Sequence, residues 1–169
     1  MTEHTNRNNY SYGRVWEEML KKIFMKKLPK HVKVVDAADT MRDRDENSVP
    51  DLMLVDTKTH KNVYYDAKRK TFYWDKNNKR SVFTLDASIT ESYRSIADKT
   101  DSKVYIAVWD DKKDPDHYYL LDVSVPETDR YMYDNQYNKD GKPSYRWAKE
   151  LFTKIKIEES VDYEHYLTA

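Results

Sequence analysis

Two aspartates and a lysine, Asp51, Asp66 and Lys68, are the residues whose types and spacing point most clearly to chemistry. They lie in two β-rich runs, at 51–56 and 63–70, which a turn at 57–61 would join into a hairpin. If the turn is centred between Lys58 and Thr59, paired residues have numbers that sum to 117, and Asp51 stands opposite Asp66. Opposed side chains have Cβ atoms about 4.5–5.5 Å apart. Lys68 shares the face of Asp66 because side chains alternate along a strand.

Two opposed carboxylates repel each other, so a strand pair normally avoids this arrangement. A divalent cation relieves the repulsion, and hard oxygen ligands suit Mg²⁺ or Mn²⁺. The opposite face of the same hairpin is apolar and suits a protein core; it carries Leu52, Leu54, Val63, Tyr65 and Ala67. This division of faces depends on the register, because a slip by one residue would turn every side chain of one strand to the other face.

A helix is predicted upstream, over residues 14–27, from the apolar spacing of Trp16, Leu20, Ile23 and Phe24. At about 100° per residue, Glu17 falls on the rim of this apolar stripe and Glu18 faces water. Glu17 can therefore reach over the sheet edge toward the aspartates.

The remaining segments alternate between strand and helix patterns. Residues 1–12 are polar and predict a flexible lead-in. Strands are expected at 31–38, at 103–109 as a fully buried run, and at 117–125. A helix is expected to start at Asp86 or Ser88, with Ser88–Glu91 as a capping box. Residues 126–144 are predicted to form a loop, and residues 145–154 a last helix. One mixed sheet flanked by helices accounts for this order.

The pair of segments Pro50-Asp51 and Asp66-Ala67-Lys68 resembles the signature of the PD-(D/E)XK nuclease superfamily, which includes restriction endonucleases and archaeal-type Holliday-junction resolvases. The resemblance covers residues 13–110, including the helix with Gly13 and Glu17. It implies an α/β, restriction-endonuclease-like αβββαβ core with a mixed central sheet. It also implies a metal-dependent endonuclease that hydrolyses phosphodiester bonds and requires Mg²⁺ or Mn²⁺.

The resemblance also implies roles for individual residues. Asp51, Asp66 and the Ala67 carbonyl would bind the metal, and Glu17 would complete its shell or hold a second ion. Lys68 would orient or deprotonate the attacking water and offset charge in the transition state. A bound metal acts as a Lewis acid and lowers the pKa of its water, as phosphodiester hydrolysis requires.

Basic residues near these positions are candidate nucleic-acid contacts, although the net charge of the chain is zero. Lysines gather at 19–33, and lysines with arginines at 68–80. We expect Lys21, Arg69 and Lys70 to contact phosphates, with DNA rather than RNA as the partner. Tyrosines among the basic residues of 131–146 either stack on bases or pack on the core, and core packing is the favoured interpretation.

Other interpretations of the same residues stay open. Asp51, Asp66 and Lys68 would also fit a surface salt-bridge cluster, and Glu17 an ordinary solvated carboxylate. The presence of His31 suggests a cap-snatching-like RNA endonuclease as an alternative, although His31 lies at the start of a predicted strand rather than on a helix. A non-catalytic nucleic-acid-binding module with a vestigial site is a further alternative. Extra metal ligands at Asp36, Asp39 and Asp43 are disfavoured because they lie on another strand or in a charged loop.

Composition excludes several other classes. The chain has 169 residues, two glycines and no cysteine, which excludes glycine-rich phosphate loops, disulfide scaffolds and thiolate metal sites. No apolar run approaches membrane-spanning length, so we expect an intracellular, cytoplasmic protein without a membrane partner, with a phage or mobile element as one candidate source. Residues 13–125 would form the nuclease core and 126–169 an extension of the same domain. The absence of an obvious recognition domain favours a structure-selective, resolvase-like enzyme, and a homodimer is a candidate assembly.

Overall fold

A six-stranded mixed sheet forms the centre of the computed structural model, which describes residues 3–37, 48–131 and 142–157. Only β3 and β6 pair in parallel; the other neighbours are antiparallel. The strand order across the sheet is β1 (Val32–Asp36), β2 (Leu52–Asp56), β3 (Asn62–Arg69), β6 (Lys103–Trp109), β7 (His117–Asp122) and β10 (Thr153–Lys156). The predicted fold class, a mixed sheet flanked by helices, is confirmed.

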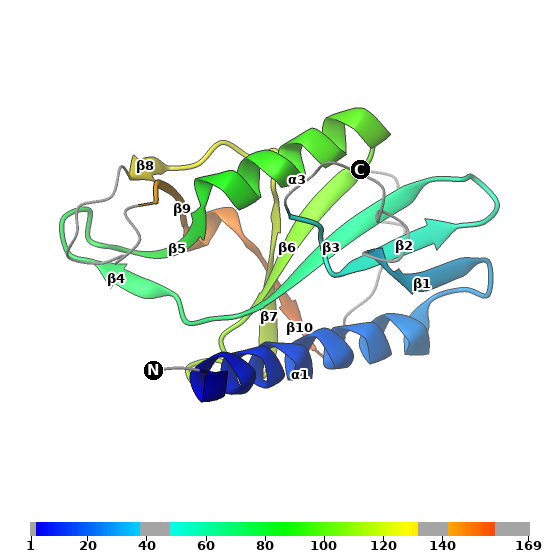
Figure 1. Ribbon diagram of the computed structural model, residues 1–169, viewed down its shortest axis with the longest axis horizontal. Coiled ribbons are helices and arrows are strands. Elements are labelled where there is room, and N and C mark those ends of the chain that lie inside the picture. Colours follow the sequence, from blue (N-terminus) through cyan, green and yellow to red (C-terminus); the bar gives the residue numbers. More distant parts are fainter. Residues whose placement is uncertain (1–2, 38–47, 132–141, 158–169) are drawn as a thin grey trace.

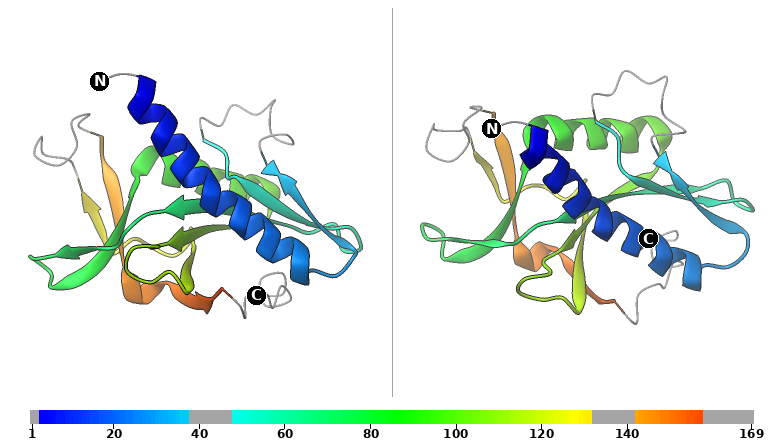
Figure 2. Two further views of the ribbon diagram at one scale, coloured as in Figure 1. Left: turned by 90° about the horizontal axis from the view of Figure 1, so that it is seen from below. Right: turned by 60° about the horizontal axis from the view of Figure 1, so that its bottom comes forward.

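Two helices, α1 (Glu3–Lys27) and α3 (Ala87–Thr100), cover opposite faces of this sheet (Figures 1 and 2). Trp16, Leu20 and Phe24 of α1 pack against alternate residues of β2, β3 and β6. Trp16 also donates its indole N–H to the main-chain oxygen of Ala107 at 3.0 Å, which fixes the helix on β6. On the other face, Tyr93 belongs to the cluster that α3 forms with the sheet. Both faces of β3 are therefore buried.

The β2–β3 hairpin has the predicted register. Leu52 pairs with Tyr65 and Leu54 with Val63, so the paired numbers sum to 117. Asp51 lies one residue before β2 and continues this register opposite Asp66. The apolar set on the face away from Asp66 lies under α1, as expected.

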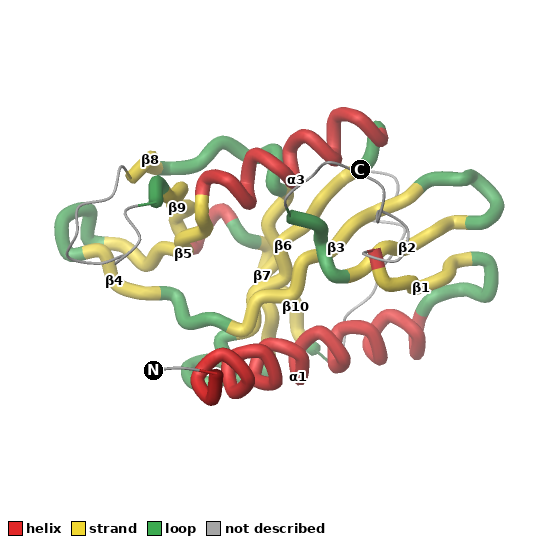
Figure 3. The backbone as a smooth tube through the Cα atoms, viewed as in Figure 1, coloured by secondary structure: helices red, strands yellow, loops and turns green. Residues whose placement is uncertain are grey.

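A second, four-stranded antiparallel sheet extends from the end of the molecule where α3 begins (Figure 3). Its order is β4 (Tyr73–Asp75), β5 (Arg80–Asp86), β9 (Ser144–Ala148) and β8 (Asp129–Tyr131). The expectation of a single sheet is therefore wrong. The predicted helix at 145–154 is also wrong, since the chain forms β9, the short 3-10 helix η1 (Lys149–Leu151) and β10 there. The alternation of buried Tyr145, half-buried Arg146 and buried Trp147 is a strand pattern, and pairing with β5 stabilises it.

The predicted helix start at residue 14 is wrong, because α1 already begins at Glu3. A cluster at its first described side chain explains the extension. Arg69 lies over the Tyr12 ring at 3.6 Å and donates to the Tyr12 main-chain oxygen at 3.0 Å. The Tyr12 hydroxyl donates to Asp111 at 3.0 Å. Once this turn is fixed, each further helical residue adds one hydrogen bond at small entropic cost.

The second long helix begins at the predicted place but without the predicted cap. Asp86 is the N-cap residue and makes no side-chain capping bond, and Glu91 instead accepts a hydrogen bond from the Tyr145 hydroxyl. Arg94 of α3 pairs with Glu127 at 2.8 Å and ties the helix to the segment before β8. Among the described residues, no helix has the length and apolar character needed to cross a membrane.

Candidate active site

The candidate site lies where β2 begins beside the middle of β3, on the sheet face that α3 covers. Pro50 is buried, and as a residue without an N–H it is tolerated at a strand entrance. Asp51 follows it, and its Oδ2 accepts a hydrogen bond from the Ala67 main-chain N–H at 2.8 Å. The side chain thus satisfies an amide that lies beyond the end of the β2–β3 ladder, and this bond holds the carboxylate beside Asp66.

Asp66 and Lys68 share one face of β3, the central strand of the sheet, as alternation predicts. Asp66 is only 2% exposed, and Lys68 Nζ lies 3.0 Å from its Oδ2. No described residue makes a hydrogen bond of regular geometry to this buried oxygen. Tyr93, which projects from α3, interacts through its hydroxyl with the Asp66 carboxylate. Asp66 is therefore held from its own strand and from the covering helix.

Burial, together with the crowding of negative charge, governs the electrostatics of this site. Burial and the neighbouring charge of Asp66 raise the pKa of Asp51 well above its usual range, although the hydrogen bond from Ala67 opposes the shift. Burial lowers the pKa of Lys68, but the charges of Asp66 and Asp51 outweigh that effect and the pKa lies above its ordinary value. Burial, followed by the charge of Asp66, also raises the pKa of Tyr93. The site therefore favours added positive charge.

Glu17 lies at the edge of the site rather than inside it. Burial and the nearby carboxylate of Asp36 raise its pKa, and its charge acts on Asp51 in turn. No group of three or more His, Cys, Asp or Glu side chains with metal-binding geometry occurs among the described residues. The structure therefore pairs Asp51 with Asp66 and leaves Glu17 outside a direct three-carboxylate cluster. Asp36 is closer to this region than expected and forms an ion pair with Lys21 at 3.4 Å.

Three basic residues were predicted to contact nucleic acid. Among the described contacts, Lys21 and Arg69 form ion pairs with carboxylates, whereas Lys70, beside the site, does not. Its Nζ donates to the Thr84 oxygen at 3.3 Å, and desolvation and the charge of Lys68 lower its pKa. Lys21 is paired with Asp36. Arg69 forms a 2.6 Å ion pair with Asp111 and lies between aromatic rings, so its charge is used inside the fold.

Two further residues belong to the site and were missed as such. Tyr93 was not singled out from the sequence, and Asp86 was named only as a helix start. The Asp86 charge acts on both Lys68 and Lys70. Asp86 is the last residue of a β-rich run and directly precedes a helix, and this position is the sequence feature that could have identified it.

The described residues on which the alternative interpretations depend do not lie at the candidate site. His31 lies 3.9 Å from Asp56, at the turn end of β2, five residues from Asp51, or about 17 Å along a strand. This position does not support the cap-snatching subtype. Tyr145 is buried in the core, as the core interpretation predicts. Asp39, Asp43, Tyr133 and Tyr137 lie outside the described residues.

Comparison with known proteins supports the architecture and not a sequence family. No protein-family model matches the chain, and no curated protein matches it by sequence. The fold is similar to that of Archaeoglobus fulgidus Hjc, a Holliday junction resolvase, with a TM-score of 0.52 and 12% sequence identity. The match covers 87% of this chain and 93% of that chain. It confirms the restriction-endonuclease-like fold class predicted from the sequence.

Proposed function

We propose that this protein is a metal-dependent endonuclease that hydrolyses phosphodiester bonds of nucleic acid. The observation that carries the proposal is the convergence of Asp51, Asp66 and Lys68 on one face of a central strand, in a fold shared with a Holliday junction resolvase. A surface salt-bridge cluster does not account for this geometry. One carboxylate is almost fully buried, and a second is held next to it, where the two repel.

The residues present fit a divalent cation. Asp66 has a buried oxygen with no regular hydrogen bond from the described residues, and Asp51 keeps one oxygen that Ala67 does not use. These carboxylates and the Ala67 carbonyl would hold Mg²⁺ or Mn²⁺, which favour oxygen ligands. Glu17 would act on the same ion from the site edge, by charge or as a more distant ligand. When bound, the ion would supply Lewis acidity and a water of lowered pKa.

The chain itself would position the reactants and balance their charge. Lys68, held at 3.0 Å from Asp66, would orient the attacking water and offset negative charge that develops on the phosphate. Tyr93, which projects from α3, would help to hold the Asp66 carboxylate. Lys70 would contact a substrate phosphate next to the one that is cut.

For the substrate, we infer DNA rather than RNA, with selection by structure rather than by sequence. The described strands of 126–169 complete the two sheets, because β10 pairs with β7 and β9 with β5. We therefore propose that the described parts of this segment belong to the same domain rather than to a separate sequence-reading module. Symmetric cutting of two strands requires two sites, so the proposal includes a homodimer.

The test is a cleavage assay on labelled single-stranded, duplex, flap and four-way-junction DNA and single-stranded RNA. Each substrate is incubated with Mg²⁺, Mn²⁺ or EDTA. The site variants are Asp51→Asn and Lys68→Ala. Matched controls are Asp98→Asn, an exposed aspartate of α3, and Lys58→Ala, an exposed lysine of the β2–β3 turn.

We expect metal-dependent cutting that both site variants lose and both controls keep. Preference for the junction would support a resolvase-like enzyme, and cutting confined to RNA would overturn the DNA assignment. No cleavage of any substrate, together with Mn²⁺ binding by calorimetry that Asp51→Asn does not change, would contradict the proposal. A non-catalytic binding module would then be the better description.

A further inference from the structure

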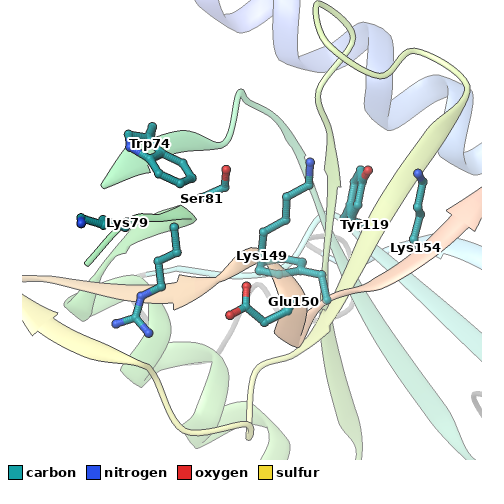
Figure 4. Close-up of a pocket in the computed structure, with 9 residues that line it drawn as sticks. Trp74, Lys79, Ser81, Tyr119, Lys149, Glu150 and Lys154 are labelled. Carbon is teal, nitrogen blue, oxygen red and sulfur yellow. The ribbon is translucent and has the colours of Figure 1, made fainter. Parts of the chain in front are cut away.

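A basic, aromatic groove lies between the β4–β5 hairpin and the segment η1–β10, apart from the residues of the candidate active site (Figure 4). Its volume is about 660 Å³. The side chains around it carry four cationic groups and one carboxylate, together with three aromatic rings. They are Trp74, Lys79, Arg80, Ser81, Tyr119, Lys149, Glu150, Phe152 and Lys154.

The charges of this groove are only partly balanced within the fold. Arg80 pairs with Asp129 at 3.1 Å, and Lys154 lies 3.7 Å from Asp114 while its side chain stays 55% exposed. The ammonium of Lys149 instead lies over two aromatic rings, 5.0 Å from the centre of Phe72 and 4.7 Å from that of Tyr119. The rings hold this cation in place without neutralising it, so the charge remains available to an anion.

Trp74 adds a flat apolar surface at the groove. It is 59% exposed on the short strand β4, where it pairs with Ser81. Figure 4 shows Trp74 and Ser81 on one side of Lys149, with Tyr119 and Lys154 on the other. Exposed aromatic rings beside cations that track phosphates are the arrangement that binds single-stranded nucleic acid, because unpaired bases stack on the rings. A duplex keeps its bases stacked inside and gains nothing from such a ring.

The groove is covalently close to the candidate active site. Trp74 follows Lys68 by six residues, and the intervening chain runs directly from β3 into β4. Six residues span at most about 20 Å, which corresponds to about six nucleotides of one strand at 3.4 Å each. A strand that leaves the site therefore needs only about six nucleotides to span the distance to Trp74.

We propose that this groove binds an unpaired strand of the nucleic-acid substrate, with bases stacked on Trp74 and phosphates contacted by Lys149 and Lys79. The inference rests on the proposed nuclease function and deepens it. The preferred substrate would carry a single-stranded arm next to the phosphate that is cut.

The test is a binding titration in EDTA, where metal-dependent cleavage cannot occur, with a fluorescein-labelled oligothymidylate of about 15 nucleotides and a blunt duplex of equal length. The variants are Trp74→Ala, Trp74→Phe and the double variant Lys79→Gln/Lys149→Gln. The controls are Met25→Ala, another exposed apolar side chain, and Lys26→Gln, an exposed lysine of α1. Circular dichroism verifies the fold of each.

We expect Trp74→Ala to weaken oligothymidylate binding about tenfold and Trp74→Phe much less, because phenylalanine still stacks. The double lysine variant should lower the slope of log K against log salt by about 1.4, or 0.7 per lost phosphate contact. Tryptophan quenching by the oligonucleotide should fall sharply in Trp74→Phe, since Trp16 and Trp147 are fully buried and Trp109 is half-buried. Duplex binding should change less than twofold in Trp74→Ala.

Unchanged oligothymidylate binding by Trp74→Ala would overturn the inference, as would equal losses for single strand and duplex or an equal loss in Met25→Ala. These results are separate from those of the cleavage assay. Cleavage lost only in the Asp51 and Lys68 variants, with Trp74 irrelevant to binding, would keep the nuclease and reject the groove. Selective binding by Trp74 with no cleavage of any substrate would reject the nuclease and leave a single-strand-binding groove.

Discussion

Replacement of Asp51 by asparagine should abolish cleavage and, in the absence of metal, make the protein more stable. Asp66 is buried and Asp51 is half-buried beside it, and this desolvation together with the charge of Asp66 raises the pKa of Asp51. Asparagine has nearly the same shape, and its oxygen can still accept the hydrogen bond from Ala67. Its amide N–H can in addition donate to Asp66. The substitution therefore removes a repulsion and keeps the local geometry.

The size of the effect follows from the register of the hairpin. Opposed side chains place the two charges about 5 Å apart, and at an effective dielectric constant of about 20 their repulsion is about 3 kcal/mol. Lys68 already offsets part of this repulsion, which leaves a net gain of about 1–2 kcal/mol in the free energy of unfolding. For a chain of this length, that gain corresponds to a rise in Tm of about 3–6 °C.

The assay is thermal unfolding followed by circular dichroism, with EDTA or Mn²⁺, over a range of pH. Because the pKa of Asp51 is raised in the folded state, the free energy of unfolding decreases as the pH rises above the ordinary carboxyl pKa of about 4. The advantage of Asp51→Asn should therefore be small near pH 4 and grow toward neutral pH. Saturating Mn²⁺ should stabilise the wild type, by about 2.7 kcal/mol at a hundred times Kd, and the variant much less.

Two results would refute this reasoning. A Tm of Asp51→Asn below that of the wild type in EDTA at neutral pH would show that the carboxylate stabilises the fold and is not crowded. Equal stabilisation of both proteins by Mn²⁺ would show that the ion binds elsewhere. Asp98→Asn is the matched control, and neither its Tm nor its response to Mn²⁺ should change.

Three further predictions concern residues around the site and the frame that holds it. Tyr93→Phe removes the hydroxyl donor to Asp66, and we expect about tenfold slower cleavage and weaker Mn²⁺ binding by calorimetry, with an unchanged far-UV spectrum. Arg69→Ala removes the charged partner of Asp111 and leaves it only the Tyr12 hydroxyl, which should cost about 2 kcal/mol in urea unfolding and speed hydrogen exchange in the first turns of α1; unchanged exchange would contradict the anchoring role. The pKa of Glu127 is lowered to about 2, because hydrogen bonds from its arginine partners outweigh the opposing effect of burial. The ionised carboxylate therefore stabilises the folded state fully above the ordinary glutamate pKa, and this stabilisation is lost as the pH falls toward 2. In Glu127→Gln, the free energy of unfolding should fall less between pH 7 and pH 3 than in the wild type. An equal fall in both proteins would refute this prediction.

The sequence alone determined the centre of the site because every relation there is local. Asp51 and Asp66 are joined by a tight hairpin whose length sets the register, and Lys68 shares the face of Asp66 through the two-residue period of a strand. The buried strand β6 was also predictable from the sequence, since a short continuous apolar run rich in valine and aromatic residues favours a strand covered on both faces. The register of the hairpin and the buried strand at 103–109 were both confirmed.

Other features depended on partners far along the chain, and the tertiary structure alone decided them. Residues 145–154 carry a pattern that both a helix and a strand can use, and pairing with β5, some sixty residues earlier, selects the strand. Arg69 is next to a catalytic candidate in the sequence, yet Asp111, 42 residues away, takes up its charge. Tyr93 reads as an apolar helix residue until α3 packs over β3 and brings its hydroxyl to Asp66. Local spacing fixes which side chains share a face, whereas the partner of a buried polar group depends on which distant element the packed core brings against it.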